Sequence, residues 1–464
     1  MPDRDLSFDV ADFFFDTRYE KLSPEAIDGA KKSILDTFGV CLAASGKEPA
    51  VHAIVDMVQE TSGKGESSLI AFGGKVPAVM AAFANGAMAH CLDYDDQTPW
   101  GQHSASSLLP AVFAISERVG GVSGKQMISA VAAGQDFFNR FRQHVDWQKD
   151  WMFSTVMGVF GAAAAGAKLL GLSREQVANA IGIASMQCSG LAEVVNSTGG
   201  DLRALYAGFP AKGAVLSAIL AERGISGLPA AFEGPFGIMN QYFQGRYDRD
   251  KILDGLGENY TGGQTLYKRW PAVGTAHSHI HATIGLVTEN DLSLEDIAEI
   301  RVFVGDYHRL MCEPIETRRA PQTLVDAKFS LPFLVSVAAV KRDMRLASFT
   351  QEGIHDARVL AAAQKILPIV DSSLDWKLEL PPGRVEIVTN DGRRFERVGT
   401  DIPGSVENPM SWDDIFRKFD DCARAAIKPW STETIGKAQD LVLNLDAKDD
   451  ATELLRLTSP PKDA

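Results

Sequence analysis

The chain has 464 residues, of which 45% are hydrophobic and 23% charged, so it is long enough for a large core and two or three domains. Its formal net charge of −14 disfavours nucleic acid or an acidic membrane as a partner. The cysteines stand singly without a Cys-x-x-Cys pair, which favours reduced thiols over a disulfide framework or a zinc site. They are Cys41, Cys91, Cys188, Cys312 and Cys422.

The N-terminal residues, Met1 to Asp5, do not form a basic region followed by an apolar run, so no signal peptide is predicted. No stretch of about 18 uninterrupted apolar residues occurs, so no membrane span is predicted either. We therefore expect a cytoplasmic protein.

The sequence up to about residue 265 has the pattern of a helical domain. Ser23 and Pro24 form a typical helix start, and residues 27–38 follow with apolar side chains at helical spacing. Capping-box patterns open two later apolar runs, at Ser123 and Ser173. No glycine-rich loop of the dinucleotide or Walker type occurs, so the sequence predicts no nucleotide cofactor.

The pattern changes beyond residue 265 and predicts a smaller α+β domain from about 266 to 400. Residues 297–304 alternate as a strand does, and residues 384–398 predict a hairpin with its turn at 390–392. Between these strands, two segments are typical of helices, 330–340 and 356–366. After the hairpin, helices are predicted to begin at Ser411 and to cover 432–445; they are candidates to pack back on the first domain.

The richest cluster of chemical groups lies at residues 90–103. Asp93, Asp95 and Asp96 lie within four positions, and His103 follows shortly after. Carboxylates that leave water need donors, charge partners or a ligand, and a histidine beside them can transfer a proton near neutral pH. The sequence therefore predicts an acid–base site here, with a solvated acidic loop and a capping aspartate as the alternative.

Two further segments could bind an anion. Lys268 and Arg269 follow a Gly-rich loop at the predicted domain boundary and could hold a carboxylate, or they could form an exposed basic turn. The polar loop that leads to Arg203 could bind an anion at a helix N-terminus, or it could be an ordinary start with Asp201 as its cap.

Three alternating histidines, His277, His279 and His281, would share one face of a strand and could then hold a metal. The residues after them look helical, however, and a helix would align His277 with His281 alone. We therefore expect no metal site, and one working histidine among packing neighbours.

Taken together in their order and spacing, several segments resemble the MmgE/PrpD superfamily, which includes 2-methylcitrate dehydratase, cis-aconitate decarboxylase and iminodisuccinate epimerase. The segments are 89–96 with His103, 156–164, 203–213, 233–237, 268–271 and 327–333. The resemblance implies a large helical domain built from residues 1–265 and 401–464, with an inserted α+β lid domain at 266–400. It also implies a homodimer, a site in the cleft between the domains, and chemistry with no organic cofactor and no required metal.

The resemblance carries over to individual residues only in part. Asp93, His103 and Lys268 match the pattern of the decarboxylase-type site. Arg203 stands where the pattern has a lysine and keeps its positive charge. The pattern's histidines are replaced at three positions, by Met152, Tyr206 and Val273. Met152 and Val273 cannot transfer protons, so decarboxylation of cis-aconitate by the usual residues is not expected.

We predict proton transfer next to a carboxylate, with His103 as the proton-transfer residue, Asp93 orienting it, Lys268 stabilising negative charge and Tyr206 as a second acid. The predicted substrate-binding residues are Arg203, Arg269, His277 and Asp96. The first hypothesis is a hydro-lyase of the 2-methylcitrate dehydratase kind, acting on a small di- or tricarboxylate. The alternatives are an epimerase or racemase of a dicarboxylate, and a helical dimer that has lost its chemistry.

Overall fold

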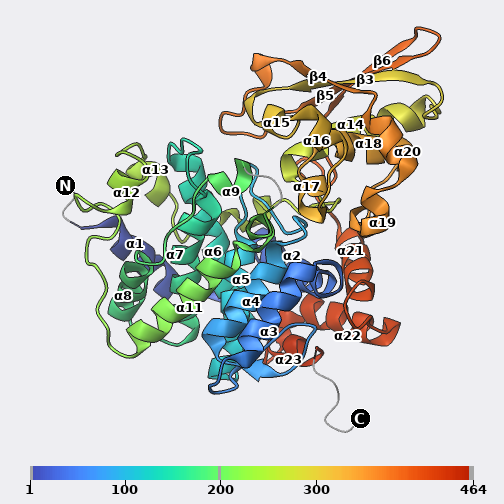
Figure 1. Ribbon diagram of the computed structural model, residues 1–464. Helices are drawn as coiled ribbons and strands as arrows, with labels where there is room; N and C mark the ends of the chain where they lie inside the picture. The colour runs from blue at the N-terminus through green and yellow to red at the C-terminus, as the bar shows by residue number, and fades with distance from the viewer. Residues whose placement is uncertain (1–3, 197–199, 459–464) are drawn as a thin grey trace.

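The computed structural model describes residues 4–196 and 200–458. It is mainly α-helical with one small mixed sheet, as the sequence predicts. Figure 1 shows a larger helical part and, at one end, the sheet with its own helices. Residues 197–199, which belong to the polar loop considered above as an anion site, lie outside the described residues.

The larger part consists of helices whose starts follow the predicted caps. The side chain of Ser23 accepts a hydrogen bond from the backbone N–H of Ala26, and Ser123 and Ser173 form complete capping boxes. The helices are α1 (Leu6–Asp16), α2 (Pro24–Lys47), α3 (Pro49–Glu60), α4 (Ala78–His90), α5 (Ala105–Val119), α6 (Gly124–His144), α7 (Phe153–Leu169), α8 (Arg174–Ala184), α9 (Glu193–Asn196), α10 (Leu202–Leu205), α11 (Gly208–Glu222), α12 (Ile238–Gln241), α13 (Arg249–Leu253), α21 (Trp412–Arg424), α22 (Thr432–Leu443) and α23 (Glu453–Arg456). The sequence did not predict the short antiparallel pair β1 (Ser67–Ser68) and β2 (Lys75–Val76).

Two glycines allow α4 and α11 to cross closely. A Cβ atom on Gly86 would lie 2.9 Å from the Cα of Gly208, closer than such atoms approach in proteins. The crossing brings the end of α4, which carries His90, beside the short helix α10 and Tyr206. The close packing thus positions two aromatic side chains of the candidate site.

The smaller part contains a four-stranded sheet in the order β4-β3-β5-β6. Strands β3 and β4 are parallel, and the other neighbours are antiparallel; β5 and β6 form the hairpin that the sequence predicts. Helices α14 and α18 pack together, with α14 against β5 and β6. The elements are α14 (His277–Glu289), β3 (Ile297–Val304), α15 (Asp306–Leu310), α16 (Ile315–Arg319), α17 (Leu324–Lys328), α18 (Leu331–Lys341), α19 (Gln351–Ile354), α20 (Ala357–Ala363), β4 (Ile366–Val370), β5 (Gly383–Thr389) and β6 (Arg394–Gly399).

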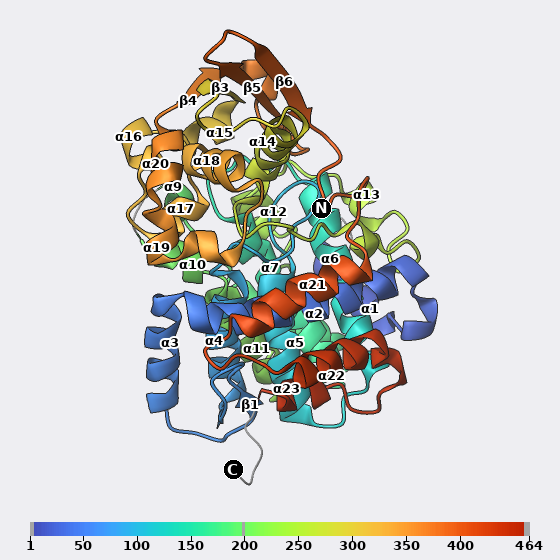
Figure 2. The same ribbon diagram turned by 90° about the vertical axis from the view of Figure 1, so that its right-hand side faces the viewer.

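The last helices return to the larger part, where α21 lies across α2 (Figure 2). The ring of Phe419 stacks on Phe38 at 6.4 Å, and the ammonium of Lys418 lies 2.6 Å from the carboxylate of Asp36. Both charged groups are buried, so each is the partner that compensates for the other's loss of water. Segments from both ends of the chain therefore share one packed body.

One segment, Leu202–Glu222, is long and apolar enough to cross a membrane by length and composition alone. However, 72% of its most apolar window is buried inside the protein. Core helices of globular proteins pass the same test, so this segment is weak evidence for a membrane span.

Candidate active site

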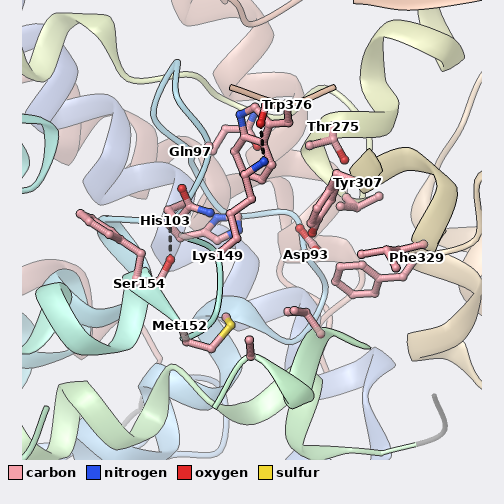
Figure 3. A pocket seen from close by; sticks show the side chains of 18 of the residues that line it. Asp93, Gln97, His103, Lys149, Met152, Ser154, Thr275, Tyr307, Phe329 and Trp376 are labelled. Atoms are coloured by element: carbon pink, nitrogen blue, oxygen red, sulfur yellow. Dashed lines mark hydrogen bonds between the residues drawn. The ribbon is translucent and has the colours of Figure 1, made fainter. Parts of the chain in front are cut away.

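A cavity of about 320 Å³ lies between the two parts of the molecule. That volume is in the range of small-molecule sites. The larger part contributes groups able to transfer protons or to hold an anion, among them His90, Asp93, His103, Lys149, Arg203 and Tyr206. The smaller part contributes, among others, Val273, Thr275, Tyr307, Phe329 and Trp376, several of which are labelled in Figure 3.

The imidazole of His103 is fixed at one nitrogen. Its Nδ1 lies 2.6 Å from the backbone oxygen of Asp96, and its backbone N–H donates to Ser154 Oγ at 3.0 Å (Figure 3). Because a carbonyl oxygen only accepts hydrogen bonds, Nδ1 carries the proton and Nε2 holds the free electron pair. Burial lowers the pKa of His103 to about 4, so the ring is neutral at pH 7 and can accept a proton.

A carboxylate lies between two imidazoles. Oδ2 of Asp95 is 3.0 Å from Nδ1 of His90 and 3.3 Å from Nδ1 of His103. Burial opposes ionisation of Asp95, but the two histidines outweigh it and hold the pKa of the carboxyl well below its ordinary value. The carboxylate in contact with His103 is thus Asp95, not Asp93 as the sequence analysis expected. The expectation was wrong because Asp93 turns away to a different partner.

That partner is Lys268, whose ammonium forms a buried ion pair with the carboxylate of Asp93 and donates to its backbone oxygen at 2.9 Å. Burial alone would raise the pKa of Asp93, but the charge of Lys268, with smaller contributions from His90 and His103, lowers it. Asp93 lines the cavity, whereas Lys268 lies behind it and lines a neighbouring cavity. Asp93 has a positive φ of 49°, so the chain reverses sharply just after α4.

Arg203 and Tyr206 come from the short helix α10 and the residue after it. The guanidinium of Arg203 lies directly over the ring of Phe329 from the smaller part, 3.5 Å from its centroid, and burial lowers the pKa of Arg203. The ring of Tyr206 lies 4.4 Å from that of His90. Burial raises the pKa of Tyr206 well above its ordinary value, so the phenol keeps its proton.

Three residues predicted to bind substrate do not line this cavity. Asp96 accepts hydrogen bonds from Ser104 Oγ and the backbone of Ala105, at 2.9 and 3.1 Å, and so caps α5. Arg269 is half-exposed and lies 3.6 Å from Asp414. Nε2 of His277 contacts a backbone oxygen at 3.3 Å, and burial lowers the pKa of this histidine to about 3. Their roles in binding stay predictions.

The three alternating histidines lie on α14, in a helix rather than a strand. Among the described residues, the side chains with metal-ligand spacing lie elsewhere: ligand atoms of His90, Asp95 and His103 are all within 4.8 Å of one another. In both histidines Nδ1 contacts an oxygen acceptor, so this cluster forms a hydrogen-bond network as it stands.

Sequence reasoning missed much of the cavity. His90 and Asp95 lie in the segment that the analysis singled out, but their pairing depends on where α4 ends. One wall is formed by four aromatic side chains, Trp147, Trp151, Phe153 and Trp376, which we call the aromatic wall. Trp376 lies far from the others in the sequence, so no local pattern connects them.

Comparisons with known proteins agree on one family. The model of the MmgE/PrpD N-terminal domain matches residues 9–250, and that of the MmgE/PrpD C-terminal domain matches residues 270–442. The chain is 26% identical to a cis-aconitate decarboxylase of Aspergillus terreus, over 95% of this chain and 93% of that one. It is 26% identical to the human cis-aconitate decarboxylase over 95% and 92%, and 23% identical to the 2-methylcitrate dehydratase of Escherichia coli over 86% of each.

Proposed function

Because the chain belongs to the MmgE/PrpD family, whose relatives reported above are a decarboxylase and a dehydratase, we propose that it is a lyase acting on a small carboxylic acid. The proposed reaction is the loss of water next to a carboxylate, with the chain's own side chains as acid and base. The supporting observation is the neutral, oriented imidazole of His103 at the cavity.

In the proposed reaction, Nε2 of His103 removes the proton from the carbon next to the substrate carboxylate. The electron pair of that C–H bond forms the C=C bond, and the neighbouring C–O bond breaks. The leaving hydroxide takes the proton of Tyr206 and departs as water; the proton on His103 then returns to the phenolate through solvent. A positioned proton-transfer group contributes roughly 10²–10⁴ to the rate.

The charged residues stabilise the groups that change. Arg203 can grip the substrate carboxylate with two N–H groups and stabilise the charge that develops on it. Asp95, whose carboxylate lies 3.3 Å from Nδ1 of His103, contributes most to stabilising the imidazolium that His103 becomes; Asp93, which Lys268 keeps ionised in its buried position, contributes less. This assigns Lys268 to the charge balance of the site, behind the residues that would touch substrate.

Decarboxylation remains a second candidate, because decarboxylases are among the relatives matched over most of the chain. It needs the same grip on a carboxylate but no leaving hydroxide. Met152 and Val273 line the cavity where the decarboxylase-type pattern has histidines, so the set of side chains that this pattern uses is incomplete here. That favours the dehydratase reading, and the relatives lend no support to an epimerase.

The test is proton NMR of the purified protein with hydroxy and unsaturated carboxylic acids in D₂O. New vinylic signals with retention of every carboxylate would support the hydro-lyase, and loss of a carboxylate would support the decarboxylase. Entry of deuterium next to a carboxylate, with inversion and without elimination, would replace the lyase by an epimerase. Silence with every acid offered would overturn the proposed function.

We further propose that residues 266–400 act as a lid over the cavity. Both parts line it, and one side chain bridges them at its rim: Nζ of Lys149 donates to the backbone oxygen of Trp376 and lies 3.3 Å from the carboxylate of Asp306 (Figure 3). Opening the lid would have to break these contacts. Faster hydrogen exchange around Trp376 without ligand than with it would support the lid, and equal exchange would oppose it.

The chain is also proposed to form a homodimer. Three exposed apolar side chains, Leu191, Leu202 and Phe209, line a neighbouring hollow that shares Met152, Arg203 and Tyr206 with the cavity. Exposed apolar side chains that gather in one place are typical of an interface between protein chains. Light scattering coupled to gel filtration tests the proposal, since a monomer mass at micromolar concentration would contradict it.

A further inference from the structure

The lining of the cavity combines two kinds of groups. His90, His103, Asp93 and Arg203 can transfer protons or bind an anion, and the aromatic wall with Leu380 adds an apolar surface. The acid–base chemistry does not need the aromatic wall, and a small polycarboxylate would place carboxylate oxygens against its rings. Apolar walls favour apolar groups, since burying such groups is the dominant favourable contribution to binding.

The rings of the aromatic wall hold one another in place. The centroid of Trp147 lies 6.0 Å from that of Trp376 and 5.9 Å from that of Phe153, in both cases nearly edge to face, and Trp151 stacks on Phe153 at 6.0 Å. Trp376 is in addition 5.1 Å from the ring of Tyr307, at nearly a right angle. A surface fixed in this way presents a preformed site rather than a loose apolar patch.

A buried arginine supports this wall from one side. The guanidinium of Arg142 lies 5.4, 5.8 and 5.9 Å from the ring centroids of Trp147, Phe153 and Trp376, and its Nε donates to Gln102 Oε1 at 2.8 Å. It is nearly inaccessible to solvent. Its charge rests on aromatic faces, an arrangement that fixes the rings further.

The charges around the cavity are nearly balanced. Among the described residues of its lining, the cations Lys149 and Arg203 face the carboxylates of Asp93 and Asp306, and Lys149 and Asp306 lie 3.3 Å apart. The charged groups behind the lining include the cations Lys268, Arg142 and Arg318 and the carboxylates of Asp95 and Asp326, the last of which acts on Arg318. Asp96, whose pKa is raised to about 7 by burial and by Asp95, adds at most one further negative charge.

The site therefore has an excess of one positive charge at most. One carboxylate can be neutralised there, whereas a tricarboxylate would bring about three negative charges into a buried site that lacks the cations to pair with them. Met152 and Val273 also make the site less suited to several carboxylates, because both place apolar atoms where the family pattern has histidines.

On these grounds, and resting on the proposed function, we propose that the substrate is a monocarboxylate that carries a bulky apolar group, seated against the aromatic wall, with its carboxylate at Arg203. Citrate-like tricarboxylates are then poor ligands of this chain. The proposal concerns which acid binds, so binding can test it even if the reaction is not the loss of water.

The experiment measures binding by quenching of tryptophan fluorescence, with isothermal titration calorimetry as a second readout. The wild type contains three tryptophans at the cavity, Trp147, Trp151 and Trp376, that can report a ligand there. The probes are 3-hydroxy-3-phenylpropanoate, 3-hydroxybutanoate, 2-methylcitrate and cis-aconitate. We expect the phenyl compound to bind at least about tenfold more tightly than each of the other three.

Two variants locate the apolar group. Trp376→Ala should weaken binding of the phenyl compound about tenfold and change binding of 3-hydroxybutanoate by no more than about twofold. Trp376→Leu keeps more apolar volume and should lose less affinity for the phenyl compound than Trp376→Ala does. The matched control is Trp412→Phe on α21, outside the cavity, which should bind every probe as the wild type does. Unfolding curves of each variant identify any loss that comes from misfolding.

Equal or tighter binding of 2-methylcitrate or cis-aconitate than of the phenyl compound would overturn the proposal. Equal effects of Trp376→Ala on the phenyl compound and on 3-hydroxybutanoate would also overturn it, because the ring would then not contact the apolar group. Selective binding without any turnover would leave this proposal standing and count against the proposed function, so the two failures are distinguishable.

Discussion

Nδ1 of His103 lies 3.3 Å from Oδ2 of Asp95, and the same oxygen lies 3.0 Å from Nδ1 of His90. One buried carboxylate therefore contacts the Nδ1 side of two imidazoles, and both rings line the cavity. A carboxylate in this position fixes the tautomer that leaves Nε2 free to accept a proton. The carboxylate that orients the base is thus separate from Asp93, which balances charge with Lys268.

Asp95→Asn tests the orienting role. The negative charge of Asp95 raises the pKa of His103 against the effect of burial, so its loss should move that pKa further below about 4. A NMR titration of the histidine ring protons should show this shift, with turnover at pH 7 reduced roughly 10²-fold or more and KM little changed. An unshifted titration of His103 would show that Asp95 does not act on it.

Lys268→Met tests the buried ion pair. The substitution leaves the carboxylate of Asp93 buried without its cation, which typically costs about 3–5 kcal/mol. Urea unfolding should show this loss, and the double variant Asp93→Asn, Lys268→Met should recover a large part of it. If the double variant were as unstable as the single one, the pair would not be the source of the loss.

The elements that could be predicted from the sequence are those whose formation depends on residues close together in the chain. Serine caps, the hairpin at 390–392 and the strand β3 follow from local patterns, and the structure confirms them. Strand β4 was missed because residues 356–366 read as a helix, whereas the helix ends at Ala363 and Ile366 already pairs with Ile300, distant in the sequence. Pairing between distant segments has no local signal.

The same distinction holds for the site. His103 and the acidic segment around Asp93 could be found because the residues lie together in the sequence. The sequence could not predict which carboxylate pairs with which cation. This depends on the turn at Asp93 and on the position of Lys268, which is distant in the sequence. Trp376 and Tyr307 reach the cavity only through the packing of the two parts.

His279→Gln tests how buried neutral histidines couple stability to pH. Burial lowers the pKa of His279 to about 3, while its ordinary value is 6.5, so between these values the unfolded chain binds a proton that the folded chain does not. Stability should therefore fall as the pH drops through this range, by up to about 1.4 kcal/mol per pH unit. Glutamine can keep the hydrogen bond to the backbone oxygen of Phe303 and should make the slope shallower.

The slope is measured by urea unfolding at pH 7 and pH 5. The matched control is His355→Gln, the same substitution at an exposed histidine, which measures what the change of side chain does without burial. Equal slopes in the wild type and in His279→Gln would mean that this histidine is protonated in the folded protein, contrary to its burial.

Lys149→Met tests the bridge at the rim of the cavity. The substitution removes the contacts with Asp306 and with the backbone of Trp376, so amides near Trp376 should exchange their hydrogens a few-fold faster, as for the loss of a partly exposed ion pair. Hydrogen-exchange mass spectrometry measures this, with Lys125→Met, at the opposite end of α6 from Arg142, as the control. If amide hydrogen exchange near Trp376 were unchanged, Lys149 would not contribute to holding the lid closed.

The central claim is that His103 removes the proton next to the substrate carboxylate, and exchange of that proton for deuterium in His103→Asn tests it most directly. Asparagine can keep the hydrogen bond to the backbone oxygen of Asp96 but cannot act as a base near neutral pH. With an acid that the wild type converts, exchange and product formation should fall together, by at least about 10²-fold, in a variant that unfolds like the wild type. Exchange in His103→Asn at the rate of the wild type would contradict the account.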